Sequence, residues 1–338
     1  MVPGPRRGRR SARRAFDYVP AARLEGRPHV MVDGAPRAGT VFTLSHWPRT
    51  PTPPWLRGDL SAELVRDALR RRRSLPPAPA TASLDHYAVD GVVALALVVV
   101  DGLEQTHGPL LVEAARVGDF DVVTDPDAAR IAFALNALVP DPDGPQPLTA
   151  GSEATAEALA LVGDLASAPE RHRSLWGKEW AAYQASRRAL ADGAATIEER
   201  PELDLAVVRV DPARGAMAEA GWKHAPLHPA AVHSATTCLR VATLTGPRAE
   251  LRFRYESWVR LAGRRARPRV DLSGVADELT AEEGGGRRWV FDGAGALTPA
   301  LHRPGGEGEG TVGPDRFLEV LCRALPRLDA GPAAWDPG

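Results

Sequence analysis

Short apolar runs rich in β-forming residues alternate with helix-length amphipathic segments along the first half of the chain. Residues 29–33 and 40–45 have the pattern of strands, and residues 62–72 have one apolar side, as a helix does. A short strand is expected at residues 80–84, and the apolar run 91–100 follows it where a helix belongs. Because alternating strands and helices are typical of parallel sheets, this half predicts an α/β fold with a doubly wound, mostly parallel sheet.

The pattern changes in the second half of the chain. Residues 249–257 alternate almost strictly between apolar and polar positions, which predicts a half-buried strand. The turn at residues 246–248 separates it from the strand expected at 236–245, so the two should form an antiparallel hairpin. We expect a third strand at 204–210. The remaining helices are expected at 110–117, 126–138, 152–191 with a break near Pro169, 272–282 and 315–325.

These patterns divide the chain into four parts. Six arginines lie among Pro, Gly and Ala in residues 1–15, which predicts a disordered basic tail. The α/β domain is expected to span residues 16–145, up to a segment rich in Pro and Gly. A helical connector at 146–200 then leads to a smaller α+β domain at 201–338.

Composition narrows the classes of function. Of the 338 residues, 25% are charged and the formal net charge is -1, so the sequence carries no strong nucleic-acid signal and no attraction to anionic membranes. The basic start is not followed by the apolar core of a secretion signal, and the run 91–100 is too short to cross a bilayer. Cys238 and Cys322 are far apart, which disfavours a disulfide scaffold or a zinc–thiolate site. We therefore expect a cytoplasmic bacterial protein with no membrane partner, for which a homodimer is one compatible assembly.

The segment 84–97 is the part of the sequence most suggestive of chemistry. Asp85, His86 and Asp90 lie between an expected strand and an expected helix, and Gly91 follows them. Side chains on such a loop can converge on one point, and carboxylates with an imidazole are ligands for Mn²⁺ or Mg²⁺. A bound metal would polarise a phosphoryl oxygen, and the helix N-terminus would add hydrogen-bond donors for phosphate.

From His86 onward this segment resembles the first motif of the DHH phosphoesterase superfamily. The resemblance implies a metal-dependent hydrolase, a phosphoesterase using Mn²⁺ or Mg²⁺, with His86 and Asp90 as catalytic metal ligands. Gly91 matches a glycine that lets the chain turn tightly into the helix. Ala88 stands where the central aspartate of the motif belongs, and a methyl group cannot bind a cation, so the motif is degenerate.

Two further acids are candidates for the missing ligand. Asp85 adjoins the motif, although neighbouring residues on an extended strand point to opposite faces. Asp119, in the sequence Gly-Asp-Phe-Asp at residues 118–121, is the other candidate metal ligand. The adjacent histidines of the superfamily's later motif are absent from this sequence.

The expected partner is a small phosphate-containing ligand. The resemblance places a glycine-rich substrate loop in the second domain, and residues 282–288 are its counterpart, with Arg287 and Arg288 suited to binding phosphate. His46 follows an expected strand, where sites of α/β proteins usually open, and is the third candidate for substrate binding.

The chain also resembles an uncharacterised actinobacterial family of unknown function. The segments that carry this resemblance are residues 43–48, 86–91, 118–120 and 269–272. In that family the central loop is closer to His-Phe-Asp-x-Asp-Gly, so this chain is expected to have lost the middle acid. The family implies no function.

Three interpretations follow from the sequence. The first is a phosphoesterase acting on a small phosphate ester or short nucleotide. The second, favoured by Ala88, is a non-catalytic relative that keeps the fold and binds a nucleotide or a protein partner. The third is an unrelated α/β protein in which residues 85–91 form an ordinary turn and Asp90 caps its own helix.

Overall fold

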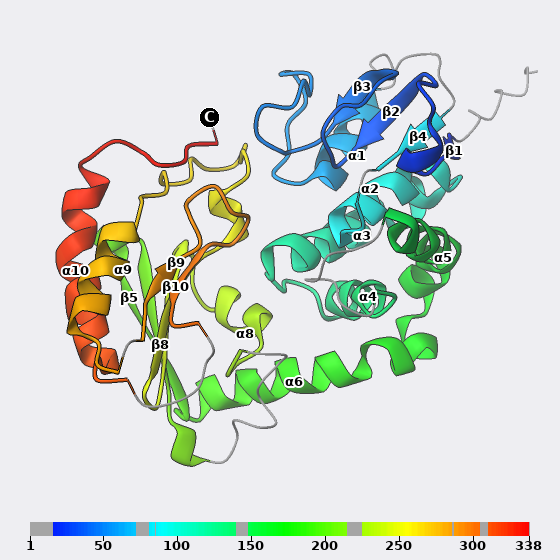
Figure 1. Ribbon diagram of the computed structural model, residues 1–338. Helices are drawn as coiled ribbons and strands as arrows, with labels where there is room; N and C mark the ends of the chain where they lie inside the picture. Colours follow the sequence, from blue (N-terminus) through cyan, green and yellow to red (C-terminus); the bar gives the residue numbers. More distant parts are fainter. Residues whose placement is uncertain are drawn as a thin grey trace, which may run out of the picture.

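The computed structural model describes residues 16–71, 81–84, 86–139, 148–214, 225–285, 287–304 and 310–337. The predicted tail at residues 1–15, Asp85 and the predicted boundary near residue 145 lie outside the described residues. The described residues form a parallel sheet in the first half of the chain and a mixed sheet in the second, with helices around both (Figure 1). The predicted α/β fold class is therefore confirmed, whereas the division of the chain into four parts stays a prediction.

The first sheet has four parallel strands in the order β1-β4-β2-β3. Because the strands are parallel, the carboxyl ends of β2, β3 and β4 lie at one edge of the sheet, and the loops that follow them meet there. Strand β1 is a short addition that the sequence pattern did not reveal. The bounds are Asp17–Tyr18 for β1, His29–Val32 for β2, Thr40–Leu44 for β3 and Thr81–Ser83 for β4.

Four helices complete this half, and α2 lies at its centre. The residues of α2 from Val89 to Val98 are all buried, because the helix contacts the sheet on one side and α1 and α3 on the others. Helix α3 begins earlier than the expected residue 110 because it continues through Pro109. The helices are α1 (Ser61–Arg71), α2 (Val89–Val99), α3 (Leu103–Phe120) and α4 (Pro126–Asn136).

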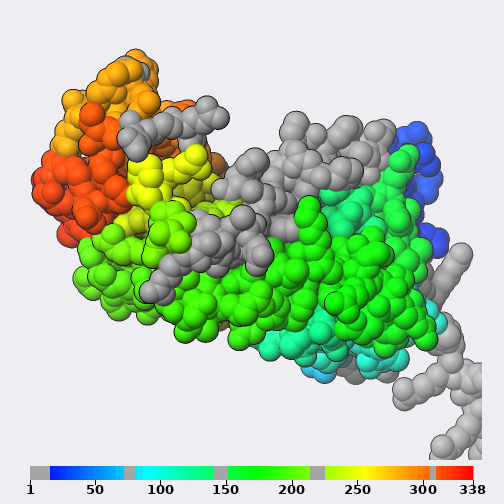
Figure 2. Space-filling model, turned by 90° about the horizontal axis from the view of Figure 1, so that it is seen from below, coloured from blue at the N-terminus to red at the C-terminus, as the bar shows by residue number. Residues whose placement is uncertain are grey.

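Two long helices connect the halves. Helix α5 (Leu148–Ser167) packs on the first half, and α6 (Arg173–Ala191) runs from there to the second sheet, as Figures 1 and 2 show. The break between them, predicted near Pro169, is a short 3-10 helix at Pro169–His172. Among the described residues, no helix is long and apolar enough to span a membrane.

The second sheet has six strands in the order β5-β6-β7-β8-β10-β9. Only β6 and β7 are parallel, and β7 and β8 form the antiparallel hairpin predicted from the sequence. The strands are β5 (Ala195–Arg200), β6 (Leu205–Val210), β7 (Arg240–Thr245), β8 (Arg248–Phe253), β9 (Val290–Phe291) and β10 (Ala300–His302).

Helices cover both faces of the second sheet. Successive residues of a strand point to opposite faces, and accordingly Val207 packs in the core under α9 and α10 while Val208 packs in the core with α6 and α8. The bounds of these helices are Pro229–His233 for α8, Ser273–Glu282 for α9 and Pro314–Asp329 for α10. The α8 side of this sheet faces the first half of the chain (Figure 1).

Candidate metal centre

Three buried polar side chains converge at the carboxyl edge of the first sheet. Asp33 directly follows β2, His46 lies two residues after β3, and Asp90 is the second residue of α2, which follows β4. One ligand atom of each lies within 4.8 Å of those of the other two. All three residues are at most 3% exposed. The parallel sheet thus gathers ligands that are far apart in the sequence.

The imidazole of His46 has a defined orientation. Its Nδ1 lies 2.6 Å from the carbonyl oxygen of Asp59, and because a carbonyl only accepts, Nδ1 carries the proton of this hydrogen bond. The other ring nitrogen, Nε2, lies 3.6 Å from Oδ1 of Asp33, 3.8 Å from Oδ2 of Asp90 and 3.5 Å from Oδ2 of Asp119. In the neutral ring, the Nε2 lone pair therefore faces three carboxylates. Metal-binding histidines usually have this arrangement, with the second nitrogen fixed by a carbonyl or a carboxylate.

The spacing of these atoms suits a shared cation. The distances from Nε2 to the three carboxylates are too long for hydrogen bonds. Two ligands that each lie about 2.1 Å from one ion, at octahedral or tetrahedral angles, are separated by about 3.0–3.4 Å. The two carboxylates lie 3.6 and 3.8 Å from Nε2, and the three ligand atoms lie within 4.8 Å of one another, so side-chain movements would let Asp33, His46 and Asp90 hold one divalent ion.

Asp90 is held by the N-terminus of a different helix. Its Oδ2 accepts a hydrogen bond of 2.7 Å from the backbone N–H of Ser61, and its Oδ1 accepts one of 2.9 Å from Ala62, both in the first turn of α1. The N-cap of its own helix is Ala88, so the interpretation that Asp90 caps its own helix is wrong. Burial, and then the charge of Asp33, raise the pKa of Asp90 to about 7.

The position of the Asp33 carboxylate requires a strained backbone at Asp33 and the absence of a side chain at Gly91. It has a φ of 44°, in the left-handed region, and its Oδ1 accepts a hydrogen bond of 2.8 Å from the hydroxyl of Ser61. A Cβ atom at Gly91 would lie 2.8 Å from Oδ2 of Asp33. Gly91 lies within α2 without a positive φ, so its contribution is space for this carboxylate rather than the tight turn expected from the sequence.

Asp119, from the last turn of α3, adds a third acidic side chain beside the centre. Its side chain is 8% exposed, and its Oδ2 lies 3.5 Å from Nε2 of His46. Burial, and then the charges of Asp90 and Asp33, raise its pKa well above the ordinary value. Three neighbouring carboxylates of this kind are costly to keep ionised in a buried place unless a cation balances them.

The sequence-predicted residues fall into three groups. Asp90 and His46 belong to the group of converging ligands and Asp119 adjoins it, although His46 was expected to bind substrate. His86 lies outside this group: it is exposed, and its ring centroid is 5.1 Å from that of Trp47. The placement of Asp85 is outside the described residues.

The two arginines expected to bind phosphate lie in the second half. Arg287 and Arg288 are exposed, in the segment between α9 and β9. Trp289, which follows them, is buried and stacks on Phe317 of α10 at 5.1 Å between ring centroids. This segment thus packs against the α10 side of the second sheet, and the phosphate-binding role of the two arginines stays a prediction.

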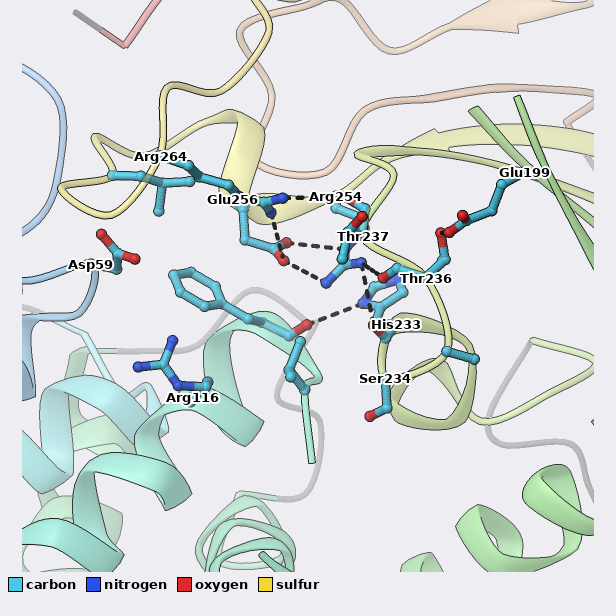
Figure 3. Close-up of a pocket in the computed structure, with 14 residues that line it drawn as sticks. Asp59, Arg116, Glu199, His233, Ser234, Thr236, Thr237, Arg254, Glu256 and Arg264 are labelled. Carbon is cyan, nitrogen blue, oxygen red and sulfur yellow. Dashed lines mark hydrogen bonds and ion pairs between the residues drawn. The ribbon is translucent and has the colours of Figure 1, made fainter. Parts of the chain in front are cut away.

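A pocket of about 440 Å³, with several charged residues in its lining, lies between the two halves (Figure 3). Its wall from the first half includes Asp59 and Phe120, which also adjoin the candidate metal centre. The ring centroids of Phe120 and His46 are 6.3 Å apart, so one side chain borders both the pocket and the centre. Among the described residues, those that line it are Asp59, Arg116, Phe120, Val122, Glu199, His233, Ser234, Ala235, Thr236, Thr237, Arg254, Glu256, Leu261 and Arg264.

Two arginines bring positive charge to this pocket from opposite halves. Arg116 of α3 forms ion pairs with Glu63 and, at 3.5 Å, with Glu113. Arg264 donates a hydrogen bond of 3.2 Å to the carbonyl of Thr237 and forms an ion pair with Glu256 at 3.7 Å, and 42% of its side chain is exposed. Each guanidinium has five N–H donors, so these bonds leave donors for a ligand.

Sequence reasoning missed Asp33, Asp59 and Tyr255. Asp33 ends an expected strand, and placing it beside His46 required the knowledge that β2 and β3 are adjacent and parallel. Asp59 acts through its carbonyl group, which every residue has. Tyr255 comes from the second half, and its hydroxyl lies 3.4 Å from Nε2 of His46. Burial raises the pKa of Tyr255 well above its ordinary value, and the charge of Asp119 adds to this effect.

The fold and the centre define an α/β protein with an acidic and imidazole cluster buried at the carboxyl edge of a parallel sheet. The chain belongs to a family of unknown function, DUF6687, whose family model matches residues 14–310. No curated protein matches this sequence. The resemblance to DHH phosphoesterases therefore stays a prediction.

Proposed function

We propose that this protein is a metal-dependent phosphoesterase that hydrolyses a small phosphate ester or short nucleotide. One observation supports this proposal above the others: Nε2 of His46, with Nδ1 tied to a carbonyl, faces the carboxylates of Asp33, Asp90 and Asp119 in a buried place. Asp33, His46 and Asp90 would hold the ion, with Asp119 beside it.

The donor set favours Mn²⁺ or Mg²⁺. Carboxylate oxygens suit both ions, and the imidazole nitrogen favours Mn²⁺ over Mg²⁺. The bound ion would polarise a phosphoryl oxygen and lower the pKa of an attacking water. Asp119 has the largest side-chain exposure among the three acids, so it is the one best placed to accept a proton from that water.

The remainder of the substrate would lie in the pocket beside Phe120. A volume of about 440 Å³ limits it to a small molecule. Arg116 and Arg264 would attract its negative charge from opposite sides, in place of the arginines predicted from the sequence. A short nucleotide and a phosphorylated sugar are both compatible with this lining.

The degenerate motif bears on the second interpretation, a non-catalytic relative. Ala88 removes one ligand from the loop, but Asp33 and His46 supply two from neighbouring strands. A one-metal centre is thereby complete without an acid at position 88. Replacing Ala88 with Asp distinguishes the interpretations: a gain in Mn²⁺ affinity together with a gain in hydrolysis would indicate that the natural chain is a binding protein which has lost catalysis.

The test begins with the metal. Purified full-length chain, stripped of metal, is titrated with MnCl₂ in a calorimeter, and release of p-nitrophenol from its mono- and bis-phosphate esters is then measured with and without the ion. We expect one tightly held Mn²⁺ and hydrolysis that requires it. The variant Asp90→Asn should lose both, whereas the exposed-site variant Asp164→Asn should keep both. A chain that retains no Mn²⁺, Mg²⁺ or related divalent ion would rule out the proposal.

A further inference from the structure

Tyr255 reaches the candidate metal centre from the second half of the chain. It begins the 3-10 turn Tyr255–Ser257, close after β8. Its hydroxyl lies 3.4 Å from Nε2 of His46, and the two rings meet edge to face with centroids 5.9 Å apart. The second half therefore supplies a polar atom beside the ring nitrogen that the carboxylates surround.

The hydroxyl proton of Tyr255 is held by a long hydrogen bond. Because Nδ1 of His46 carries the ring proton, the acceptor of this bond is Nε2 of His46, at the long limit of 3.4 Å, and a metal ion would occupy that lone pair. An oxygen of a ligand at the centre would give the proton a better acceptor.

The phenol is also held rigidly. Its ring stacks on Trp258, with centroids 5.9 Å apart and planes at 19°, and contacts Phe120 at 6.2 Å. The hydroxyl of Ser257 accepts a hydrogen bond of 2.8 Å from buried Arg269, which fixes the turn. The backbone N–H of Arg260 donates to the carbonyl oxygen of His46 at 3.3 Å, which ties the segment to the centre itself. A donor fixed in this way loses little entropy on binding a ligand.

We propose, on the basis of the proposed function, that Tyr255 is a substrate-binding residue whose hydroxyl donates a hydrogen bond to a phosphoryl oxygen of the ester. Phe120 contacts both Tyr255 and His46 and also lines the pocket. The phosphoryl end of the substrate thus lies between Tyr255 and the carboxylates, and its organic part extends past Phe120. The centre is then complete only when both halves of the chain contribute.

The experiment separates phosphate binding from metal binding. Manganese and orthophosphate affinities of the full chain are measured in turn by calorimetry, the phosphate titration being made on manganese-loaded protein. The variant Tyr255→Phe keeps the ring and removes the hydroxyl, and Tyr183→Phe, in α6, is the matched control. We expect Tyr255→Phe to weaken phosphate about 10-fold or more, since the lost bond is to a charged group, and to leave manganese affinity within about 2-fold.

The outcomes are distinguishable. A wild-type chain that retains no divalent ion contradicts the proposed function and this inference with it. If manganese is retained but phosphate binds equally well to wild type and Tyr255→Phe, or to neither, only the role of Tyr255 is wrong. If Tyr255→Phe loses manganese and phosphate affinity by similar factors, Tyr255 supports the ion rather than the substrate, and the inference is again wrong.

Discussion

Asp59 binds the metal-centre histidine through its carbonyl group and the second half of the chain through its carboxylate. The carbonyl oxygen lies 2.6 Å from Nδ1 of His46. Oδ1 of the same residue accepts backbone hydrogen bonds from Ala262 and Gly263. The tautomer of His46 and the contact between the two halves therefore both depend on Asp59.

Removing one carboxylate should abolish tight metal binding without unfolding the chain. In Asp33→Asn the amide oxygen can still accept the hydrogen bond from Ser61, and the repulsion with Asp90 disappears. We expect a loss in manganese affinity on the order of 100-fold, because a charged ligand is lost, and an unchanged or higher melting temperature for the metal-free chain. Calorimetric titration and thermal unfolding measure the two quantities. Equal manganese affinity in the variant and the wild type would exclude Asp33 as a ligand.

Metal binding should weaken as the pH falls through about 7. Burial raises the pKa of Asp90 to about 7 and that of Asp119 well above the ordinary value, so at lower pH an ion must displace protons from these groups. The affinity should fall by about 10-fold per pH unit for each proton displaced. Manganese titrations between about pH 5.5 and 8.5, on both sides of the pKa of Asp90, measure this pH dependence. An affinity independent of pH would indicate that Asp90 is already ionised in the metal-free chain.

The same pKa values set the sign of a stability effect. Because the folded chain holds the Asp90 proton more tightly than the unfolded chain does, this group's contribution favours folding at low pH and is lost as the pH rises from its ordinary value of 3.8 to about 7. A bound ion offsets that loss. The increase in melting temperature caused by manganese should therefore be larger at pH 8 than at pH 5.5, which differential scanning calorimetry can measure.

Gly91 should be required for the centre rather than for the helix. In Gly91→Ala, the new Cβ would lie 2.8 Å from Oδ2 and 3.3 Å from Cβ of Asp33, so this carboxylate must move. We expect manganese affinity to fall about 10-fold or more, within the range seen when the support of a ligand is disturbed. Helix propensity favours Ala over Gly by about 1 kcal/mol, which limits the loss of stability.

Two other helical glycines provide controls for that substitution. At Gly163 of α5, no atom of the described residues lies within 4 Å of an added Cβ, so Gly163→Ala should raise stability slightly and leave metal binding unchanged. At Gly118 the Cβ would lie 2.3 Å from that of Val89, so Gly118→Ala should destabilise the packing of α3 on α2. If Gly91→Ala behaves like Gly163→Ala in both measurements, the space beside Asp33 has no functional importance.

The periodic part of the fold was predictable from the sequence. Strands β2, β3 and β6 and helices α1, α2 and α4 lie within a few residues of their expected ranges, because each has a clear apolar pattern and a proline, glycine or capping residue at an end. Strands β1, β9 and β10 have two or three residues each, too few to show a period. The exposed edge strand β5 also escaped prediction, because its polar sequence lacks apolar alternation.

Single ligands of the candidate site were predictable from the sequence, but their meeting was not. Asp90 and His46 stood out because each follows an expected strand. Their meeting with Asp33 depends on the strand order β4-β2-β3, which local sequence does not specify. The approach of Tyr255 depends on how the second half docks, through contacts more than 200 positions apart in the sequence. Long-range packing of this kind determines the site, and periodicity carries no information about it.

The side chain of Asp59 should couple the contact between the halves to metal affinity. Asp59→Ala keeps the carbonyl that orients His46 but removes the acceptor of the backbone N–H groups of Ala262 and Gly263, which lie 2.5 and 2.8 Å away. These groups lie near the surface, so we expect a loss of about 1 kcal/mol in unfolding free energy. Because the segment of Ala262 and Gly263 also holds His46 through the backbone hydrogen bond from Arg260, its looser docking should lower manganese affinity several-fold. Asp59→Asn, whose amide oxygen can still accept, should restore most of both. If Asp59→Ala loses stability but binds manganese as tightly as Asp59→Asn, the two halves act independently at the centre.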